Sequence, residues 1–315
     1  MYLYVCQSFY DTPLKKTLLP LGLSGLFFGF AAASKWTGIY AGAGLCVIFF
    51  ISISKRIYEY VKITSLKSAS AEDKKKVCVL KKNTALTLLF CIAVFVIVPV
   101  MIYCASYIPY LKAPGMQGIK SIIENQKSMF DYHSTLKSTH PYSSFWYQWP
   151  FISRPVWYYT NSLGGGMRQS IAALGNPLIW WAGFAAIIFA CSKCFKKDEI
   201  SLSQSDSAAA LTKKNALFIA IAFLAEYIPW IGVTRCVFLY HYFPSVPFII
   251  LAICLFYKTV SEIADVKTLK KYDCAALVYI VLCFILFAVF YPLLSGTAAS
   301  ENYLDALKWF PTWYF

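Results

Sequence analysis

Seven long apolar stretches constrain this chain more than any other feature. They cover residues 17–34, 37–54, 84–107, 176–192, 215–232, 236–257 and 273–292, each close to the length that crosses a bilayer. Because lipid offers no hydrogen-bond partner to a backbone amide, each stretch predicts a helix. Charged residues make up only 14% of the chain, whereas soluble proteins have about a quarter. The sequence therefore predicts an all-α polytopic membrane protein with about seven transmembrane helices.

Lysine and arginine residues predict how these helices are oriented. Segments 55–82, 193–214 and 258–272 carry nine, five and four of them, which places these segments in the cytoplasm by the positive-inside rule. The N-terminus is then cytoplasmic and the C-terminus extracytoplasmic. We expect three regions: helices in 1–107, a long external segment at 108–175, and a four-helix region at 176–315.

The basic residues and cysteines do not predict binding of nucleic acid or of a metal ion. The net charge of +14 comes mainly from the connecting segments, and no basic-aromatic recognition motif accompanies it, so nucleic acid is not an expected partner. Cys191 and Cys194 have the spacing of a redox or metal motif, but no second Cys/His pair follows them. We therefore expect neither a metal nor a cofactor.

An aromatic stretch closes the predicted external segment. Residues 140–159, "HPYSSFWYQWPFISRPVWYY", contain three Trp and four Tyr and almost no aliphatic residue. One interpretation is an amphipathic segment lying on the bilayer. The other is a surface that binds a sugar or an acceptor; its candidate residues are His140, Tyr142, Trp146, Trp149 and Arg154. The following stretch, "NSLGGGMRQS", predicts a flexible hinge.

Two further clusters of cations and rings fall on the predicted outer side. Lys35 and Trp36 stand between the first two spans. Arg235 opens the sixth span, where the spacing of Arg235, Phe238 and Tyr242 predicts a shared helical face with His241 nearby. Lys35, Arg235, His241 and Tyr242 are candidates for binding a lipid phosphate. The alternatives are a snorkelling lysine at the first turn and a polar cluster that joins helices at the second.

Four stretches taken together resemble one family. "LFFGFAAASKWTGIYAGAGL", "HPYSSFWYQWPFISRPVWYY", "LGNPLIWW" and "YIPWIGVTRCVFLYHYFPSVPF" are similar to successive parts of the bacterial protein O-mannosyltransferase family, in the membrane-embedded glycosyltransferase C superfamily. The resemblance covers essentially the whole chain. It implies that the seven spans correspond to spans five to eleven of the family's eleven, that is, to its C-terminal two-thirds.

The resemblance implies a sugar donor and a protein acceptor, and it shows that the family's acidic pair has no match in this sequence. The donor is polyprenyl-phosphate-mannose, the acceptors are Ser and Thr hydroxyls of secreted or membrane proteins, and the transfer inverts the anomeric carbon. The family's acidic pair lies in its first external loop, which nothing here matches, so no catalytic base is assigned. Two alternatives stay open: a transporter or flippase of a lipid-linked sugar, and a non-catalytic membrane scaffold.

Overall fold

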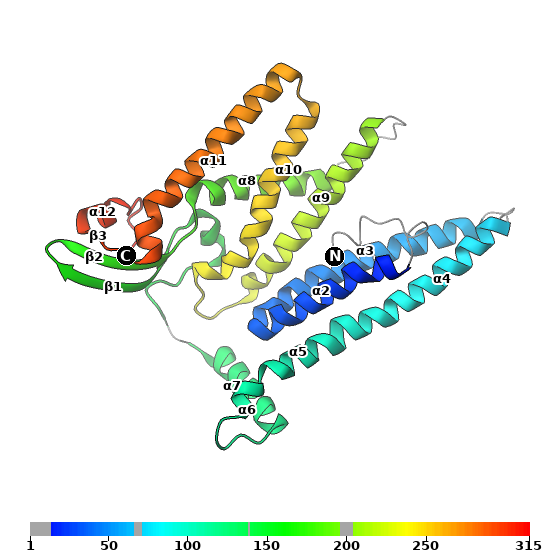
Figure 1. Ribbon diagram of the computed structural model, residues 1–315, viewed down its shortest axis with the longest axis horizontal. Coiled ribbons are helices and arrows are strands. Elements are labelled where there is room, and N and C mark those ends of the chain that lie inside the picture. The colour runs from blue at the N-terminus through cyan, green and yellow to red at the C-terminus, as the bar shows by residue number, and fades with distance from the viewer. Residues whose placement is uncertain (1–13, 66–70, 138, 196–203) are drawn as a thin grey trace. The chain divides into compact units, whose positions relative to one another are not determined.

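The computed structural model describes residues 14–65, 71–137, 139–195 and 204–315. Seven of its helices are long and apolar enough to cross a membrane, which confirms the predicted number (Figure 1). They cover Leu14–Ser34, Trp36–Lys62, Val77–Ser106, Pro177–Cys194, Ala210–Gly232, Leu239–Ile263 and Val266–Ser295. The chain divides into two compact units, with the boundary between Ser134 and Thr135. The boundary between the units falls inside the segment expected to be one external region.

The first unit contains three spans and two short helices. Its spans are α2 (Leu14–Ser34), α3 (Ile39–Thr64), and α4 (Ala71–Ile92) continuing through the π-turn η2 (Ala93–Ile97) into α5 (Val98–Ser106). Helices α6 (Ile108–Leu111) and α7 (Ile119–Thr135) follow. Most of segment 55–82, expected as a basic connection, is thus helical. Lysine and glutamate are good helix formers, so α3 and α4 continue beyond their apolar parts.

Small residues allow α2 to pack closely on its neighbours. A Cβ on Gly25 would lie 2.2 Å from the backbone oxygen of Val94, and one on Gly38 would lie 2.5 Å from the carbonyl carbon of Ala31. Close approach through glycine is the usual way for membrane helices to associate, because lipid gives no hydrophobic drive between them. The turn that carries Lys35 and Trp36 is therefore held against the end of α2 by η1 (Trp36–Gly38).

The second unit contains four spans and a small sheet. Its helices are α8 (Pro177–Cys194), α9 (Gln204–Tyr227), α10 (Val246–Ile263), α11 (Val266–Ser295) and α12 (Glu301–Ala306). The 3-10 turns η4 (Ile228–Gly232) and η5 (Leu239–Ser245) extend α9 and precede α10. α8 packs on both α9 and α10. Asn176 caps α8 by accepting from the amides of Leu178 and Ile179, with Pro177 at the first helical position as expected.

The glycine run forms a hairpin turn, so the expectation of a flexible hinge is wrong. Strands β1 (Val156–Gly164) and β2 (Met167–Ala173) pair antiparallel, and β3 (Ala299–Ser300) pairs with β2. Gly164, Gly165 and Gly166 all have positive φ angles, which glycine adopts without steric cost. Three glycines at the tip, flanked by paired strands, make a tight reversal and not a loose joint.

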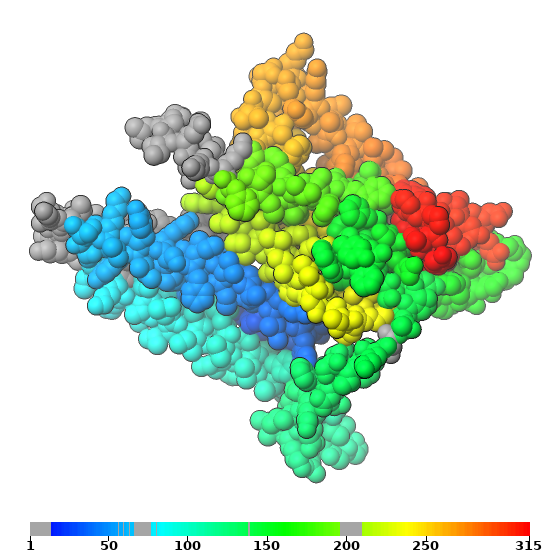
Figure 2. Space-filling view, turned by 180° about the vertical axis from the view of Figure 1, so that it is seen from behind, coloured from blue at the N-terminus to red at the C-terminus, as the bar shows by residue number. Residues whose placement is uncertain are grey.

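The C-terminal residues close against the start of the sheet. Trp313 is buried and donates its indole N–H to the carbonyl oxygen of Ile152 at 2.7 Å. The Arg168 guanidinium lies 3.3 Å from the Asp305 carboxylate and 3.4 Å from the carbonyl oxygen of Phe315. The red C-terminal residues accordingly lie against the green sheet region in both views (Figures 1 and 2). Segments far apart in sequence thus brace the hairpin.

The predicted helical face of Arg235, Phe238 and Tyr242 is wrong. Residues 233–238 are not helical, and Phe238 has the extended angles φ −139 and ψ 159 before η5 begins. Gly232 and the β-branched Val233 and Thr234 weaken the helix here. The carbonyl oxygen of Val237 also accepts a hydrogen bond from the amide of Ser144 at 2.9 Å. A non-local partner therefore takes the place of the helical one.

Replacing Gly25 by Ala tests the packing of α2. The added methyl group meets backbone atoms of Val94, which cannot rotate away, so we expect a loss of about 1–3 kcal/mol of stability. The measurement is the thermal unfolding midpoint of the purified chain in detergent. Gly232→Ala is the matched control, because a Cβ there meets nothing within 4 Å. Equal midpoints for the two variants would contradict the close approach.

Candidate aromatic site

Residues 140–157 form an irregular segment held by local and distant bonds. After extended residues, η3 (Trp146–Phe151) begins, and the side chain of Gln148 accepts from the amide of Phe145 at 2.8 Å. Ile152 ends the turn with φ 52, the one positive φ at a non-glycine residue in the described part of the chain. Together with the bond from Ser144 to Val237, this fixes the stretch on residues 233–245, which comprise the non-helical residues 233–238 and η5. Figure 2 shows the yellow atoms around residue 240 directly beside green atoms of the 140–160 region.

Trp149 forms the base of the site. Its side chain is fully buried, and its indole N–H lies 3.1 Å from both the carbonyl and the hydroxyl oxygen of Ser144. The ring stacks on His241 at 6.0 Å between centroids and meets the edge of Trp230 at 5.7 Å. We call Trp149, Trp230, His241 and Tyr242 the aromatic floor. A ring with a satisfied N–H and two aromatic partners is rigidly placed.

His241 and Tyr242 lie beneath the surface, inside the floor. The backbone N–H of Phe238 donates to Nδ1 of His241 at 3.1 Å, which orients the imidazole. Tyr242 is fully buried between Trp180, at 4.9 Å, and Tyr227, at 5.6 Å. Its hydroxyl finds no hydrogen-bond partner in the described part of the chain. Both residues therefore support the site from below and are not open to a ligand on its surface.

Rings and cations that solvent can reach surround the floor. His140 is exposed, accepts from the amide of Tyr142 at 3.2 Å, and meets the edge of Phe238 at 5.1 Å. Tyr142 is half-buried, and burial raises the pKa of its hydroxyl, which stays a neutral donor at physiological pH. Trp146 is also half-buried, and its carbonyl oxygen accepts from the Tyr227 hydroxyl at 2.9 Å. We call these exposed and half-exposed rings the aromatic rim.

Two arginines, Arg154 and Arg235, lie on the same segments as the rim and differ in how firmly their guanidinium groups are held. Arg154 donates through Nη1 to the carbonyl oxygen of Pro141 at 2.8 Å, a bond that ties the two ends of the stretch together. Arg235 donates through Nη1 to the carbonyl oxygen of its neighbour Cys236 at 3.3 Å, a longer bond and its one hydrogen bond among the described residues. Both are half-exposed. Each guanidinium thus has further N–H donors for an anion, and the longer bond holds Arg235 less firmly than Arg154.

The sequence interpretation missed Tyr158 and Tyr240. In β1, Trp157 pairs with Ala172 and Tyr159 with Ile171, so Tyr158 is the extra residue of a bulge. Bulges re-aim side chains and are frequent beside functional sites. Burial raises the pKa of the Tyr158 hydroxyl, and the neighbouring Tyr240 of η5 raises it further. The sequence "VWYY" is typical of a strand, but this pattern does not predict where a bulge occurs.

Lys35 and Trp36 lie in the first unit. Lys35 is exposed and precedes η1 with an extended backbone, φ −160 and ψ 138. The indole N–H of Trp36 donates to the hydroxyl of Tyr103, near the end of α5, at 2.8 Å. The bond fixes Trp36 at the end of the spans, and its neighbour Lys35 reaches solvent.

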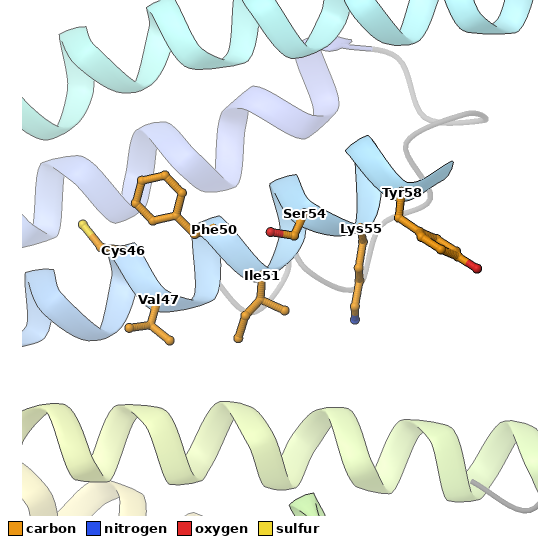
Figure 3. Close-up of a pocket in the computed structure, with 7 residues that line it drawn as sticks. All are labelled: Cys46, Val47, Phe50, Ile51, Ser54, Lys55 and Tyr58. Carbon is orange, nitrogen blue, oxygen red and sulfur yellow. The ribbon is translucent and has the colours of Figure 1, made fainter. Parts of the chain in front are cut away.

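A separate hollow lies along one face of α3 (Figure 3). It is lined by Cys46, Val47, Phe50, Ile51, Ser54, Lys55 and Tyr58. The lining is mostly apolar and comes from a single membrane-spanning helix, as expected for a surface that meets lipid. Among the described residues, no three His, Cys, Asp or Glu side chains lie together in a way that could hold a metal ion. The aromatic floor and rim therefore remain the candidate site.

Comparison with known proteins identifies the family. A family described as the C-terminal four TMM region of protein-O-mannosyltransferase matches residues 118–313. The chain belongs to the protein O-mannosyltransferase family. The matched part of this protein O-mannosyltransferase family member includes the whole aromatic floor and rim, and the resemblance drawn from the sequence is thereby confirmed.

Relatives extend the match through most of the chain. A polyprenol-phosphate-mannose–protein mannosyltransferase of Corynebacterium glutamicum is 24% identical, over 92% of this chain and 57% of that protein. Dolichyl-phosphate-mannose–protein mannosyltransferase 4 of Saccharomyces cerevisiae is 30% identical, over 52% of this chain and 21% of that protein. The chain thus spans about half the length of the bacterial relatives it matches.

A solved structure shows the same fold. The S. cerevisiae protein O-mannosyltransferase Pmt1-Pmt2 complex bound to the sugar donor matches with a TM-score of 0.54 and 22% identity, over 64% of this chain and 28% of that chain. Over the matched part, this protein O-mannosyltransferase family member therefore shares the fold of that solved structure.

Replacing Trp149 by Ala tests the aromatic floor. Removing a fully buried ring leaves a cavity and takes away the indole donor to the Ser144 carbonyl. We therefore expect the free energy of unfolding to fall by about 3–5 kcal/mol. Tyr147→Ala is the control from the same turn: Tyr147 is 53% exposed, and its loss should cost under about 1 kcal/mol. Thermal unfolding midpoints in detergent measure both. A similar small shift for both variants would rule out Trp149 as a structural base.

Proposed function

We propose that the chain takes part in protein O-mannosylation, the transfer of mannose from polyprenyl-phosphate-mannose to Ser or Thr hydroxyls of secreted or membrane proteins. One observation carries this proposal. In this member of the family, the half-exposed Arg235 has N–H donors available for an anion. It lies in the segment that also carries His241 and Tyr242 of the rigid aromatic floor. The named activities of the relatives point to the same donor and acceptor.

In this proposal Arg235 binds the donor phosphate. Its guanidinium is permanently charged and presents planar pairs of N–H donors that match phosphate oxygens. Lys35, exposed at its own turn in the first unit, is proposed as a second contact to a lipid phosphate. His241 and Tyr242 act indirectly: they are buried, and they hold the segment that carries Arg235.

The rim is the proposed surface for mannose and the acceptor. Exposed faces of His140, Tyr142 and Trp146 can pack on the apolar C–H face of a sugar while hydroxyls and ring nitrogens meet its polar edge. Trp36, in the first unit, is a separate candidate for a sugar contact at its own turn. Arg154 and Trp149 keep this surface rigid through the bonds already described. A preorganised surface avoids the entropic cost of arranging the rings at each turnover.

The chemistry that these residues support is an inverting displacement. The acceptor oxygen forms a bond to the anomeric carbon as the bond from that carbon to the phosphate oxygen breaks. Negative charge grows on the departing polyprenyl phosphate, and Arg235 stabilises it. The acceptor's proton passes to a general base, a role that we assign to no residue of this chain.

The orientation is part of the proposal. With the lysine-rich connections in the cytoplasm, the N-terminus is cytoplasmic and the aromatic rim lies outside. This arrangement suits acceptors that have already crossed the membrane. It also places the phosphate-binding side chains at the leaflet opposite the basic connections.

Replacing Arg235 by Ala tests donor binding. We expect transfer of labelled mannose from polyprenyl-phosphate-mannose to a Ser/Thr peptide to fall about 100-fold or more, as when one transition-state donor is removed. Arg235→Lys should recover only part of it, because lysine lacks the fork. Lys271→Ala, at the predicted cytoplasmic side of the same unit, should not change the rate.

The assay uses the chain alone and joined to the part of the C. glutamicum relative that it does not cover. A correctly inserted fusion that forms no glycopeptide would contradict the proposal. Movement of the lipid-linked sugar across the bilayer without glycopeptide would identify a transporter. Unchanged transfer by Arg235→Ala would remove this residue from the donor site and leave the enzyme activity standing.

Cysteine labelling tests the orientation. In a variant without native cysteines, a membrane-impermeant maleimide added to intact cells should label Tyr142→Cys, because the rim faces outward. A cysteine restored at position 78, an exposed site near the start of the third span, should react only after permeabilisation. The reverse pattern would overturn the assigned sidedness.

A further inference from the structure

Helix α7 lies outside the seven membrane spans and presents an apolar stripe. Ile119, Ile123 and Phe130 are 71%, 62% and 62% exposed. They are four and seven residues apart, so they share one face of the helix. Exposed isoleucine and phenylalanine in a row on a helix of otherwise polar composition indicate a surface that meets something apolar.

The stripe is not the face by which α7 packs on the protein. Ile122 is buried, and Asn125 and Gln126 donate to the Tyr107 hydroxyl at 3.1 and 2.7 Å. The Tyr103 hydroxyl in turn donates to the side-chain oxygen of Gln126. One side of α7 is thus committed to the ends of the spans, while the stripe beside it is left open in the first unit.

These hydrogen bonds set the depth of α7 in the membrane. Its partners Tyr103 and Tyr107 lie at the end of α5. The Tyr107 ring contacts the Tyr103 ring at 5.5 Å between centroids and meets Tyr110 edge-on at 5.8 Å, and the Tyr103 hydroxyl accepts from the indole N–H of Trp36, just after α2. A group of Trp and Tyr at the ends of spans marks the level of the lipid headgroups. A helix bonded directly to those hydroxyls lies at the same level.

Neighbouring side chains favour lipid over a protein partner. Met101 on α5 and Ile108 on α6 are 65% and 53% exposed, so the lipid-facing surface of the span continues towards α7. Lys120 and Lys127 follow Ile119 and Ile123 at spacings that place both along one edge of the stripe. Lysines beside an apolar stripe suit the boundary between acyl chains and headgroup phosphates.

We propose that α7 is an interfacial helix whose Ile119, Ile123 and Phe130 insert into the lipid leaflet at the end of α5. The sequence left two interpretations open for 140–159, an amphipathic segment on the bilayer and a binding surface; here the interfacial role falls to α7, while 140–159 contributes to the aromatic floor and rim. Through Gln126, Tyr103 and Trp36, the inserted helix holds the turn that carries Lys35 at headgroup depth.

Depth-dependent fluorescence tests this assignment on the full chain in phosphatidylcholine–phosphatidylglycerol nanodiscs, one chain per disc. An environment-sensitive fluorophore is attached at Ile123→Cys, or at Ser128→Cys, which is exposed on the opposite side of α7, in a variant without native cysteines. We expect blue-shifted emission and quenching by nitroxide-labelled lipid at position 123. Position 128 should give water-like emission and little quenching.

Three results would overturn the proposal: water-like emission at both positions, a blue shift at 123 that needs two chains in a disc, or one that appears only with an acceptor peptide. The last two would assign the stripe to a second copy or to a protein partner.

A photoactivatable phospholipid provides a second measurement on the chain with its native cysteines. Cross-links should fall on the peptide that holds Ile119 and Ile123, and their absence there would count equally against insertion.

Discussion

The absence of hydrogen-bond partners in lipid is the constraint on which this structure depends. A backbone amide in the hydrocarbon core must be paired within its own helix, and the seven spans obey this rule. Irregular backbone is therefore confined to the ends of the spans. In the second unit the two irregular segments, 140–157 and 233–245, occur together, and the bond from Ser144 to Val237 joins them. Each segment gives the other a partner that no helix supplies.

This pairing explains why the candidate site lies where it does. Trp149 from one segment and His241 from the other stack, and Trp230 in the middle of η4 contacts both rings. The neighbouring His140, Tyr142 and Arg235 lie on the same two backbone segments as these three buried rings, and each makes only a few contacts of its own in the described part of the chain. The site is thus a rigid base with accessible edges, an arrangement that suits a sugar on a charged lipid carrier.

Burial divides the candidate residues into two groups, a division that residue type could not predict. His241 and Arg235 both looked like phosphate ligands, yet one is buried and the other half-exposed. A bulge in β1 leaves Tyr158 unpaired beside Tyr240, and α7, not the aromatic stretch, is the helix proposed to lie at the interface. In each case the deciding contact comes from a residue far away in the sequence.

The sequence by itself determined the number of spans, their helical form and the family, because apolar length and motif order are local properties that lipid constrains strongly. Its placement of the rings and cations on the side opposite the lysine-rich connections stays a prediction. Only the tertiary structure decided that 233–238 is extended, that the glycine run is a hairpin, and that Trp149 lies below the surface. These features depend on non-local hydrogen bonds and ring contacts, whose partners are separated by tens of residues, and no local pattern specifies which of several exposed groups will find each other.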